Sequence, residues 1–159
     1  MMKNCLLVIF GLLLLFSSCD HKKSINTNNS ELREVESFIV EYYAVMSARN
    51  WSAYREFFSE KAILTTVWQD STETTPQIFS NTISEFIAQT ASGPDSQPIF
   101  EEKPIHIEIE IKADLAAVWV NYEAKFGSEN NLIEWKGYDL FSLIKFEGKW
   151  KIASLTYVE

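Results

Sequence analysis

Cysteine is almost absent from this chain of 159 residues, which carries only Cys5 and Cys19. The sequence after residue 19 therefore has no thiol, which excludes a disulfide framework, a cysteine nucleophile and a cysteine-ligated metal from any domain there. Glycine is scarce as well. Because the five glycines never cluster, the chain offers no glycine-rich loop for a phosphate group.

Basic residues are too few for a nucleic-acid binder, since 14 Lys and Arg face 22 Asp and Glu and the formal net charge is −8. Histidine is equally rare. His106 shares an expected strand face with Glu108 and Glu110, and one imidazole beside two carboxylates on a flat strand makes a poor metal site. We therefore expect no metal and no cofactor.

The chain has one long apolar run, Cys5–Phe16, which is shorter than the roughly 20 residues that span a bilayer. Lys3 precedes the run, and Ser17 and Ser18 follow it directly before Cys19. A charged residue, a short apolar stretch and small residues form the pattern of a secretory signal. With a cysteine at the cleavage point, this segment resembles the lipobox of bacterial lipoproteins.

This pattern predicts a lipoprotein signal peptide over residues 1–18 and a lipidated Cys19. Residues 19–30 are polar and without periodicity, so we expect a flexible tether there. The protein would then be exported to the bacterial cell envelope and anchored to a membrane through lipid. The alternative is an ordinary secreted protein cleaved near Ser18.

Residues 31–159 begin with helical patterns. A helix capped at Asn29 or Ser30 is expected to bury a stripe at three- and four-residue steps, formed by Leu32, Val35, Ile39, Tyr42 and Met46. A short second helix is expected over Trp51–Ser59. Thr75 and Pro76 favour a third helix that buries Phe79, Ile83, Phe86 and Ile87 and ends at Gly93.

Alternating apolar and polar residues predict strands around and after the third helix. The predicted strands are 62–68, 105–111, 118–126, 134–146 and 149–158. Ile105, Ile107, Ile109 and Ile111 should share one face of their strand. Helices followed by long hairpins predict an α+β domain, with the helices packed in the concave face of a curved antiparallel sheet.

Four segments resemble the nuclear transport factor 2-like superfamily, and most closely its SnoaL-like and putative lumazine-binding branch. They are 48–62, 114–123, 137–143 and 148–157. The resemblance implies a cystatin-like cone with a pocket at its open end and a homodimer formed through the outer sheet face. Relatives of this kind include isomerases, dehydratases, cyclases and proteins that only bind ligands, so the fold does not decide the function.

Asp139 is the candidate general base of the pocket. It shares a strand face with Phe141 and Leu143, and apolar surroundings raise the pKa of a carboxyl group. Its position also matches an aspartate that the resemblance implies is characteristic of the branch. Alternatively, Asp139 caps the bend at Gly137, or it faces solvent or a dimer mate, because the opposite strand face is also apolar.

Tyr122 is the candidate hydrogen-bond donor, because it lies on the most apolar face of its strand and a buried phenol needs a partner. Asp139, Ser154 or Thr156 could be that partner, and a satisfied core pair is the alternative to a catalytic one. A planar ligand could stack on four aromatic side chains at the mouth, namely Trp68, Trp119, Trp135 and Tyr157.

Three functions remain open on these grounds. The first is a domain that binds a small, aromatic molecule in its cone. The second is a metal-free isomerase, dehydratase or cyclase that uses Asp139 as general base and Tyr122 as donor. The third is a dimeric protein-interaction module that binds no ligand.

Overall fold

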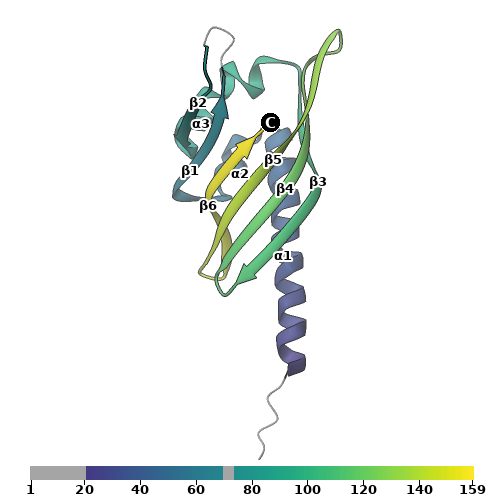
Figure 1. Ribbon diagram of the computed structural model, residues 1–159, viewed down its shortest axis with the longest axis vertical. Helices are drawn as coiled ribbons and strands as arrows, with labels where there is room; N and C mark the ends of the chain where they lie inside the picture. Colours follow the sequence, from purple (N-terminus) through teal and green to yellow (C-terminus); the bar gives the residue numbers. More distant parts are fainter. Residues whose placement is uncertain (1–20, 70–73) are drawn as a thin grey trace, which may run out of the picture.

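The computed structural model describes residues 21–69 and 74–159 (Figure 1). The helices are α1 (His21–Ser47), α2 (Trp51–Arg55) and α3 (Ile83–Gln89), with the 3₁₀ turns η1 (Thr90–Ser92) and η2 (Pro94–Ser96). The strands are β1 (Phe58–Trp68), β2 (Gln77–Thr82), β3 (Ile99–Lys112), β4 (Leu115–Ser128), β5 (Asn131–Phe146) and β6 (Lys149–Val158). The predicted signal peptide and Cys19 lie outside the described residues. Over the described ranges, no helix is both long and apolar enough to cross a membrane.

The six strands form one curved sheet in the order β2-β1-β6-β5-β4-β3. Helix α1 lies against its concave side, while α3 sits beside β1 and β2 (Figure 1). This arrangement confirms the predicted α+β cone. One pair departs from the expected antiparallel sheet, because β1 runs parallel to β6. These two strands are far apart in the sequence, so no hairpin turn imposes an antiparallel pairing on them.

Four of the five residues predicted for the apolar stripe of α1 are buried, namely Val35, Ile39, Tyr42 and Met46, and Leu32 is half-buried. The start of the helix differs from the prediction. It begins at His21, so residues 21–30 are helical where the sequence suggested a flexible tether. Neither glycine nor proline interrupts this stretch, and adding a residue to an existing helix costs far less than starting a new one.

The third helix begins later than predicted. Residues 77–82 pair with β1 as strand β2, and α3 starts only after Thr82. Thr82 caps the helix by accepting a hydrogen bond from the backbone N–H of Glu85, whose carboxylate accepts from the N–H of Thr82 in return. This reciprocal capping box is a stronger start signal than Thr75 followed by Pro76. The second helix is also shorter than predicted, because Phe58 already belongs to β1.

Strand β3 contains a bulge that breaks the predicted row of isoleucines. Pro104 pairs with Tyr122 and His106 with Asn121, so Ile105 has no partner on β4. Ile105 consequently points outward and is 51% exposed, whereas Ile107, Ile109 and Ile111 pack against the core. A bulge of this kind bends a strand and redirects its side chains.

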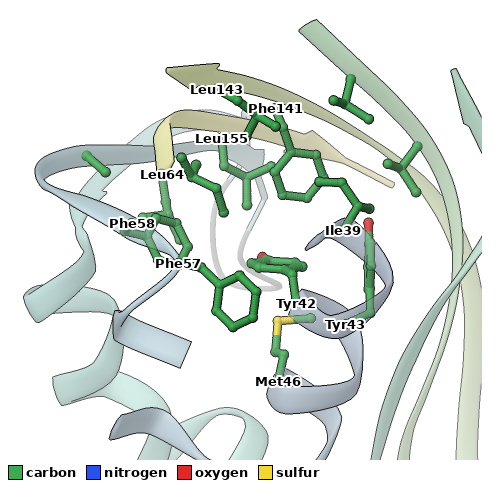
Figure 2. Packing of buried hydrophobic residues seen from close by; sticks show 14 of the residues in the cluster. Ile39, Tyr42, Tyr43, Met46, Phe57, Phe58, Leu64, Phe141, Leu143 and Leu155 are labelled. Atoms are coloured by element: carbon green, nitrogen blue, oxygen red, sulfur yellow. The ribbon is translucent and has the colours of Figure 1, made fainter. Parts of the chain in front are cut away.

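We call the tightly filled half of the cone the packed end, which is formed by Phe57, Phe58, Val118, Phe141, Leu143 and Ile152. Tyr42 from α1 stands at its centre, with its ring 5.0 Å from that of Phe141 and nearly perpendicular to it (Figure 2). Edge-to-face contacts of this type add to the stabilisation from burial. The other half of the cone, by contrast, is hollow.

Candidate functional site

The other half of the cone encloses a cavity of about 780 Å³. We call this half the cavity end and define it by Glu102, Tyr122, Trp135, Asp139 and Tyr157, which line the cavity from strands β3 to β6. Helix α1 provides the floor through Tyr42 and Met46, and Phe86 of α3 closes one side. Strands β4 and β5 pass through both ends, so the same strand faces build the core and the cavity.

Asp139 lies on the inner face of β5 and is only 4% exposed. Its Oδ2 atom accepts a hydrogen bond from the phenol of Tyr43 on α1. Burial raises the pKa of the Asp139 carboxyl to about 7, and the hydrogen bond from Tyr43 opposes that rise because it favours the ionised form. The alternative that Asp139 faces solvent is therefore wrong. The carboxyl therefore changes its charge near neutral pH, which suits a group that accepts or donates protons.

Glu102 on β3 is a second carboxyl in the same cavity, and the sequence reasoning missed it. Burial, together with the negative charges of Asp139 and Glu159, raises its pKa to about 8. Its backbone is fixed in place because the hydroxyl of Ser47 donates to the Glu102 carbonyl and accepts from its N–H, both over 2.8 Å. The sequence offered one signal that Glu102 faces the cavity, namely its two-residue spacing from Phe100. Both residues lie on the inner face of β3.

Tyr122 also lines the cavity, and it lies across Gly137 of the neighbouring strand. A Cβ at Gly137 would sit 2.5 Å from the phenol oxygen of Tyr122 and would overlap the carbonyl oxygen of Val158. Glycine is therefore required where the two strands meet beneath this ring. Burial raises the pKa of Tyr122 well above its usual value, so its hydroxyl stays protonated at neutral pH. The partner of Asp139 is Tyr43, not Tyr122 as the sequence suggested.

Three of the four aromatic residues predicted to line the mouth do so, namely Trp68, Trp135 and Tyr157. Trp119 does not. It lies on the outer face of β4, opposite Leu140 of β5, and is 51% exposed. The reason is the alternation of the strand, which turns Val118 and Val120 inward and every second side chain outward.

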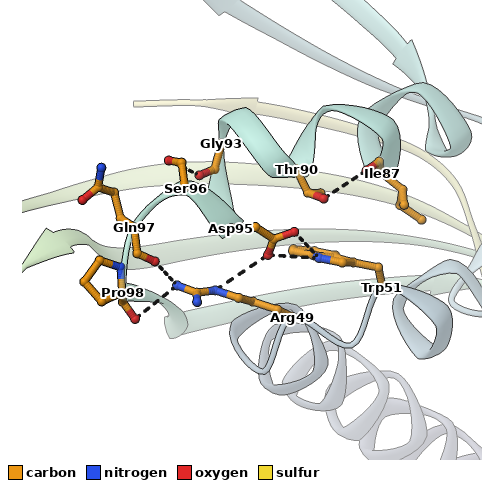
Figure 3. A network of polar contacts seen from close by, with 9 residues as sticks. All are labelled: Arg49, Trp51, Ile87, Thr90, Gly93, Asp95, Ser96, Gln97 and Pro98. Atoms are coloured by element: carbon orange, nitrogen blue, oxygen red, sulfur yellow. Dashed lines mark hydrogen bonds and ion pairs between the residues drawn. The ribbon is translucent and has the colours of Figure 1, made fainter.

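The segment between α3 and β3 forms another wall of the cavity through Gly93 and Pro94. Asp95 holds this segment against the turn after α1, because it accepts a 2.9 Å hydrogen bond from the indole of Trp51 and lies 3.9 Å from the Arg49 guanidinium (Figure 3). Arg49 also donates to the carbonyl of Gln97 over 2.8 Å. Several contacts to one short segment make this wall well defined.

The polar groups that line the cavity include carboxyl, phenol and indole groups. Among the described residues, no group of three or more His, Cys, Asp or Glu side chains could hold a metal ion. His106 contacts Glu108 on the outer surface, with 3.1 Å between Nε2 and Oε1. The cavity can thus stack a flat ring and can exchange hydrogen bonds or protons with it.

The sequence profile of a family described as putative lumazine-binding matches residues 30–158. No curated protein matches the sequence significantly. Similar solved structures include a putative scytalone dehydratase from Novosphingobium aromaticivorans, with 16% identity, a TM-score of 0.68 and coverage of 84% of this chain and 86% of that chain.

Two further structures have the same fold. A protein of unknown function from Mycobacterium tuberculosis has 12% identity and a TM-score of 0.67, with 84% of this chain and 74% of that chain covered. The beta subunit of benzoate 1,2-dioxygenase from Burkholderia mallei has 13% identity and a TM-score of 0.63, with coverage of 80% and 89%. At such identities the likeness establishes a shared fold.

Proposed function

The chain belongs to the putative lumazine-binding family, and on this premise we propose that its domain binds a small aromatic molecule in the cone. The observation that carries the proposal is the cavity itself. Its volume of about 780 Å³ falls within the range of about 300–1,000 Å³ that is typical of small-molecule sites. Lumazine, the compound in the family's description, is a fused bicyclic ring of a size that fits such a space.

The lining supports a flat ligand. Trp68, Trp135 and Tyr157 supply broad ring faces, while Tyr122 and Asp139 supply polar atoms deeper in the cavity. Burial raises the pKa of Tyr157 to about 12, so its hydroxyl remains a hydrogen-bond donor at neutral pH. A few polar groups among many apolar ones are the usual composition of a specific ligand site.

Thermal unfolding with a panel of bicyclic heterocycles, lumazine included, tests this proposal. A ligand that binds the folded state raises the melting temperature by mass action. Trp135→Leu should abolish the shift, and Trp119→Leu is the matched control because its indole lies outside the cavity. If no compound shifts wild type, or if both variants respond alike, the binding proposal fails.

An enzymatic role is the second candidate, favoured by one observation: the buried carboxyl of Asp139 with a pKa of about 7. Here Asp139 removes a proton next to a ligand carbonyl, and the phenol of Tyr122 donates a hydrogen bond to the carbonyl oxygen. Deuterium exchange at the α-carbon of bound cyclic ketones, followed by NMR, tests this role. Asp139→Asn should abolish the exchange. Exchange that persists in this variant would exclude Asp139 as the base.

We also propose that the domain is exported and held to a membrane of the cell envelope by a lipidated Cys19. The support is the sequence pattern around that cysteine. In a bacterial host, Cys19→Ser should move the full chain from the membrane to the soluble fraction. Cys5→Ser is the control that should remain in the membrane. Identical fractionation of both variants would refute lipidation at Cys19.

A homodimer is proposed through the outer-face patch, which we define as Leu115, Trp119, Tyr138 and Ile144. These side chains come from the neighbouring strands β4 and β5, where Leu115 pairs with Ile144. Contiguous exposed apolar side chains of this kind mark association surfaces. In sedimentation experiments Trp119→Lys should give monomers, whereas Glu60→Lys on β1 should not. A monomeric wild type would contradict the proposal.

A further inference from the structure

The cavity contains acidic groups without any basic counterpart. Glu102, Asp139 and Glu159 line it, whereas no lysine, arginine or histidine among the described residues does so. Neither Glu102 nor Asp139 takes part in an ion pair within the described part of the chain, although Lys125 and Lys103 on the outer side of the same sheet pair with Glu134 and Glu123. The acidic groups of the cavity therefore have no basic partner among the described residues.

Asp139 has hydrogen-bonding capacity to spare. Tyr43 satisfies Oδ2, and no described residue donates to Oδ1, although the side chain is almost completely buried and lines the cavity. Within the described residues, no side chain donates a hydrogen bond to the carboxyl group of Glu102 either. These free carboxyl oxygens line the cavity, so a ligand that supplies a donor or a positive charge would gain from reaching them.

The rest of the lining favours a cation as well. Indole and phenol rings attract a positive charge to their faces, and Trp68, Trp135, Tyr122 and Tyr157 stand around the same space. Aromatic rings beside carboxyl groups in one cavity are a combination that recognises ammonium groups, because the rings replace water around the cation while the carboxylates neutralise it. The same carboxylates would repel a negatively charged ligand.

From this arrangement we propose that the natural ligand is an organic cation, an aromatic or heteroaromatic ring that carries a protonated amine or a quaternary nitrogen directed at Glu102 and Asp139. This inference rests on the proposed function, because it names the chemical class of the molecule that the cone binds. The ring stacks on the tryptophans and Tyr157, and the positive nitrogen lies between the two carboxyl groups.

Binding of a cation should release protons. The pKa values of about 7 for Asp139 and about 8 for Glu102 leave both groups partly or mostly protonated in the empty cavity at neutral pH. A cation favours their ionised forms, so it lowers both pKa values and protons leave for solvent. The other titratable groups around the carboxyls are Glu159 and the phenols of Tyr42, Tyr43, Tyr54, Tyr122 and Tyr157. The phenols stay neutral at this pH, since burial raises the pKa of each one.

Three naphthalene derivatives with one ring system test the charge preference: 1-naphthylmethylamine, 1-naphthylmethanol and 1-naphthoate. By calorimetric titration at pH 7.5 the ammonium form should bind about tenfold more tightly than the alcohol, as expected for a charge-assisted hydrogen bond. The carboxylate should bind most weakly. Titrations of the amine in buffers with different ionisation enthalpies should show net proton release, and its affinity should rise between pH 6 and pH 8.

Glu102→Gln should remove the preference for the amine while leaving the affinity for the alcohol nearly unchanged. Glu101→Gln is the matched control, because it removes the same charge from the exposed face of the same strand. Asp139→Asn provides a second variant if Glu102→Gln does not fold. An alcohol or carboxylate that binds wild type as tightly as the amine overturns the inference but supports the proposed function. If none of the three compounds binds, both are contradicted.

Discussion

The packed end and the cavity end are built from the same faces of the same two strands, yet they differ in what they enclose. At the packed end, Val118 of β4 pairs with Phe141 of β5, and both side chains are fully buried. Only a few residues away, Tyr122 pairs with Gly137, and Asp139 follows on the inner face. The Tyr122 ring lies over Gly137 and lines the cavity, whereas at the packed end two apolar side chains lie side by side.

The two ends of the cone therefore contribute differently to the stability of the domain. Apolar side chains in close contact at the packed end stabilise the domain, because each removes nonpolar surface from water and leaves few voids. The cavity end carries the buried carboxyl of Asp139 instead, and this group lowers stability when it is charged. We expect loss of an apolar side chain at the packed end to lower the free energy of unfolding, and replacement of the Asp139 carboxyl at the cavity end to raise it above neutral pH.

Phe141→Ala should have the largest effect, because it empties the centre of the packed end. Loss of a fully buried phenylalanine typically costs about 3–5 kcal/mol. Urea denaturation monitored by circular dichroism would measure it. Phe146→Ala on the same strand is the control, since that ring is 66% exposed and should change stability little. Similar losses for both variants would remove the distinction between the packed core and the surface.

Asp139→Asn should act in the opposite direction and stabilise the protein above neutral pH. The folded-state pKa of about 7 exceeds the ordinary value of 3.8, so folding takes up a proton between those values. Stability due to this group is complete below about pH 4, falls as the pH rises toward 7, and stays low above it. At about 1.4 kcal/mol per pKa unit, the variant should gain roughly 2–4 kcal/mol at pH 8.

The same comparison at low pH provides the control for this substitution. At about pH 2.5, well below both pKa values, the carboxyl is protonated in the folded and in the unfolded chain, so wild type and Asp139→Asn should be nearly equal in stability. Asparagine can still accept the hydrogen bond from Tyr43, which keeps that contact intact. A variant less stable than wild type at pH 8 would show that the ionised carboxyl is well compensated.

Gly137→Ala should have an intermediate effect, because the new methyl group meets the Tyr122 ring and the backbone of Val158. Overpacking of this kind typically costs about 1–3 kcal/mol. Since Tyr122 and Val158 both line the cavity, ligand affinity should fall together with stability. Thermal unfolding and calorimetric titration would measure the two quantities. Wild-type affinity in a folded variant would mean that the cavity tolerates movement of Tyr122.

Thr82→Ala should have the smallest effect, a loss of about 1 kcal/mol from the missing cap of α3. Thr75→Ala is the matched control, because Thr75 is the residue that the sequence suggested as the cap. Only the substitution at Thr82 should lower the melting temperature. Phe86 of α3 closes one side of the cavity, so a frayed helix should also weaken ligand binding slightly.

The long hairpins and the main buried stripe could be predicted from the sequence, because their periodicity extends over many residues. Val118, Val120, Tyr122 and Ala124 alternate with Trp119, Asn121 and Glu123 of the other strand face, and all four are buried. In β5 both faces are apolar, which left the orientation of Asp139 open. The outer face of that strand carries exposed apolar side chains such as Tyr138, so a preference for burial cannot by itself identify the inner face.

The candidate site was only partly predictable, because two of its groups depend on contacts between distant elements. Tyr43 is next to Tyr42 and outside the predicted stripe, yet it is buried because the curved sheet surrounds more than one side of α1. Glu102 lies before the bulge at Ile105, on a strand whose later isoleucines suggested a single unbroken alternation. One sequence cannot reveal a bulge that follows from the pairing of two strands.

The position of the two ends of the domain has a practical consequence. Helix α1 has 27 residues and at 1.5 Å per residue extends about 40 Å, with its later turns beneath the cavity and its first turns projecting away from it (Figure 1). Val158 and Glu159 line the cavity itself. An affinity tag fused after Glu159 would therefore crowd the mouth and compete with ligands. Immobilisation on a sensor chip through the first turns of α1 would instead present an open mouth to the flowing solution.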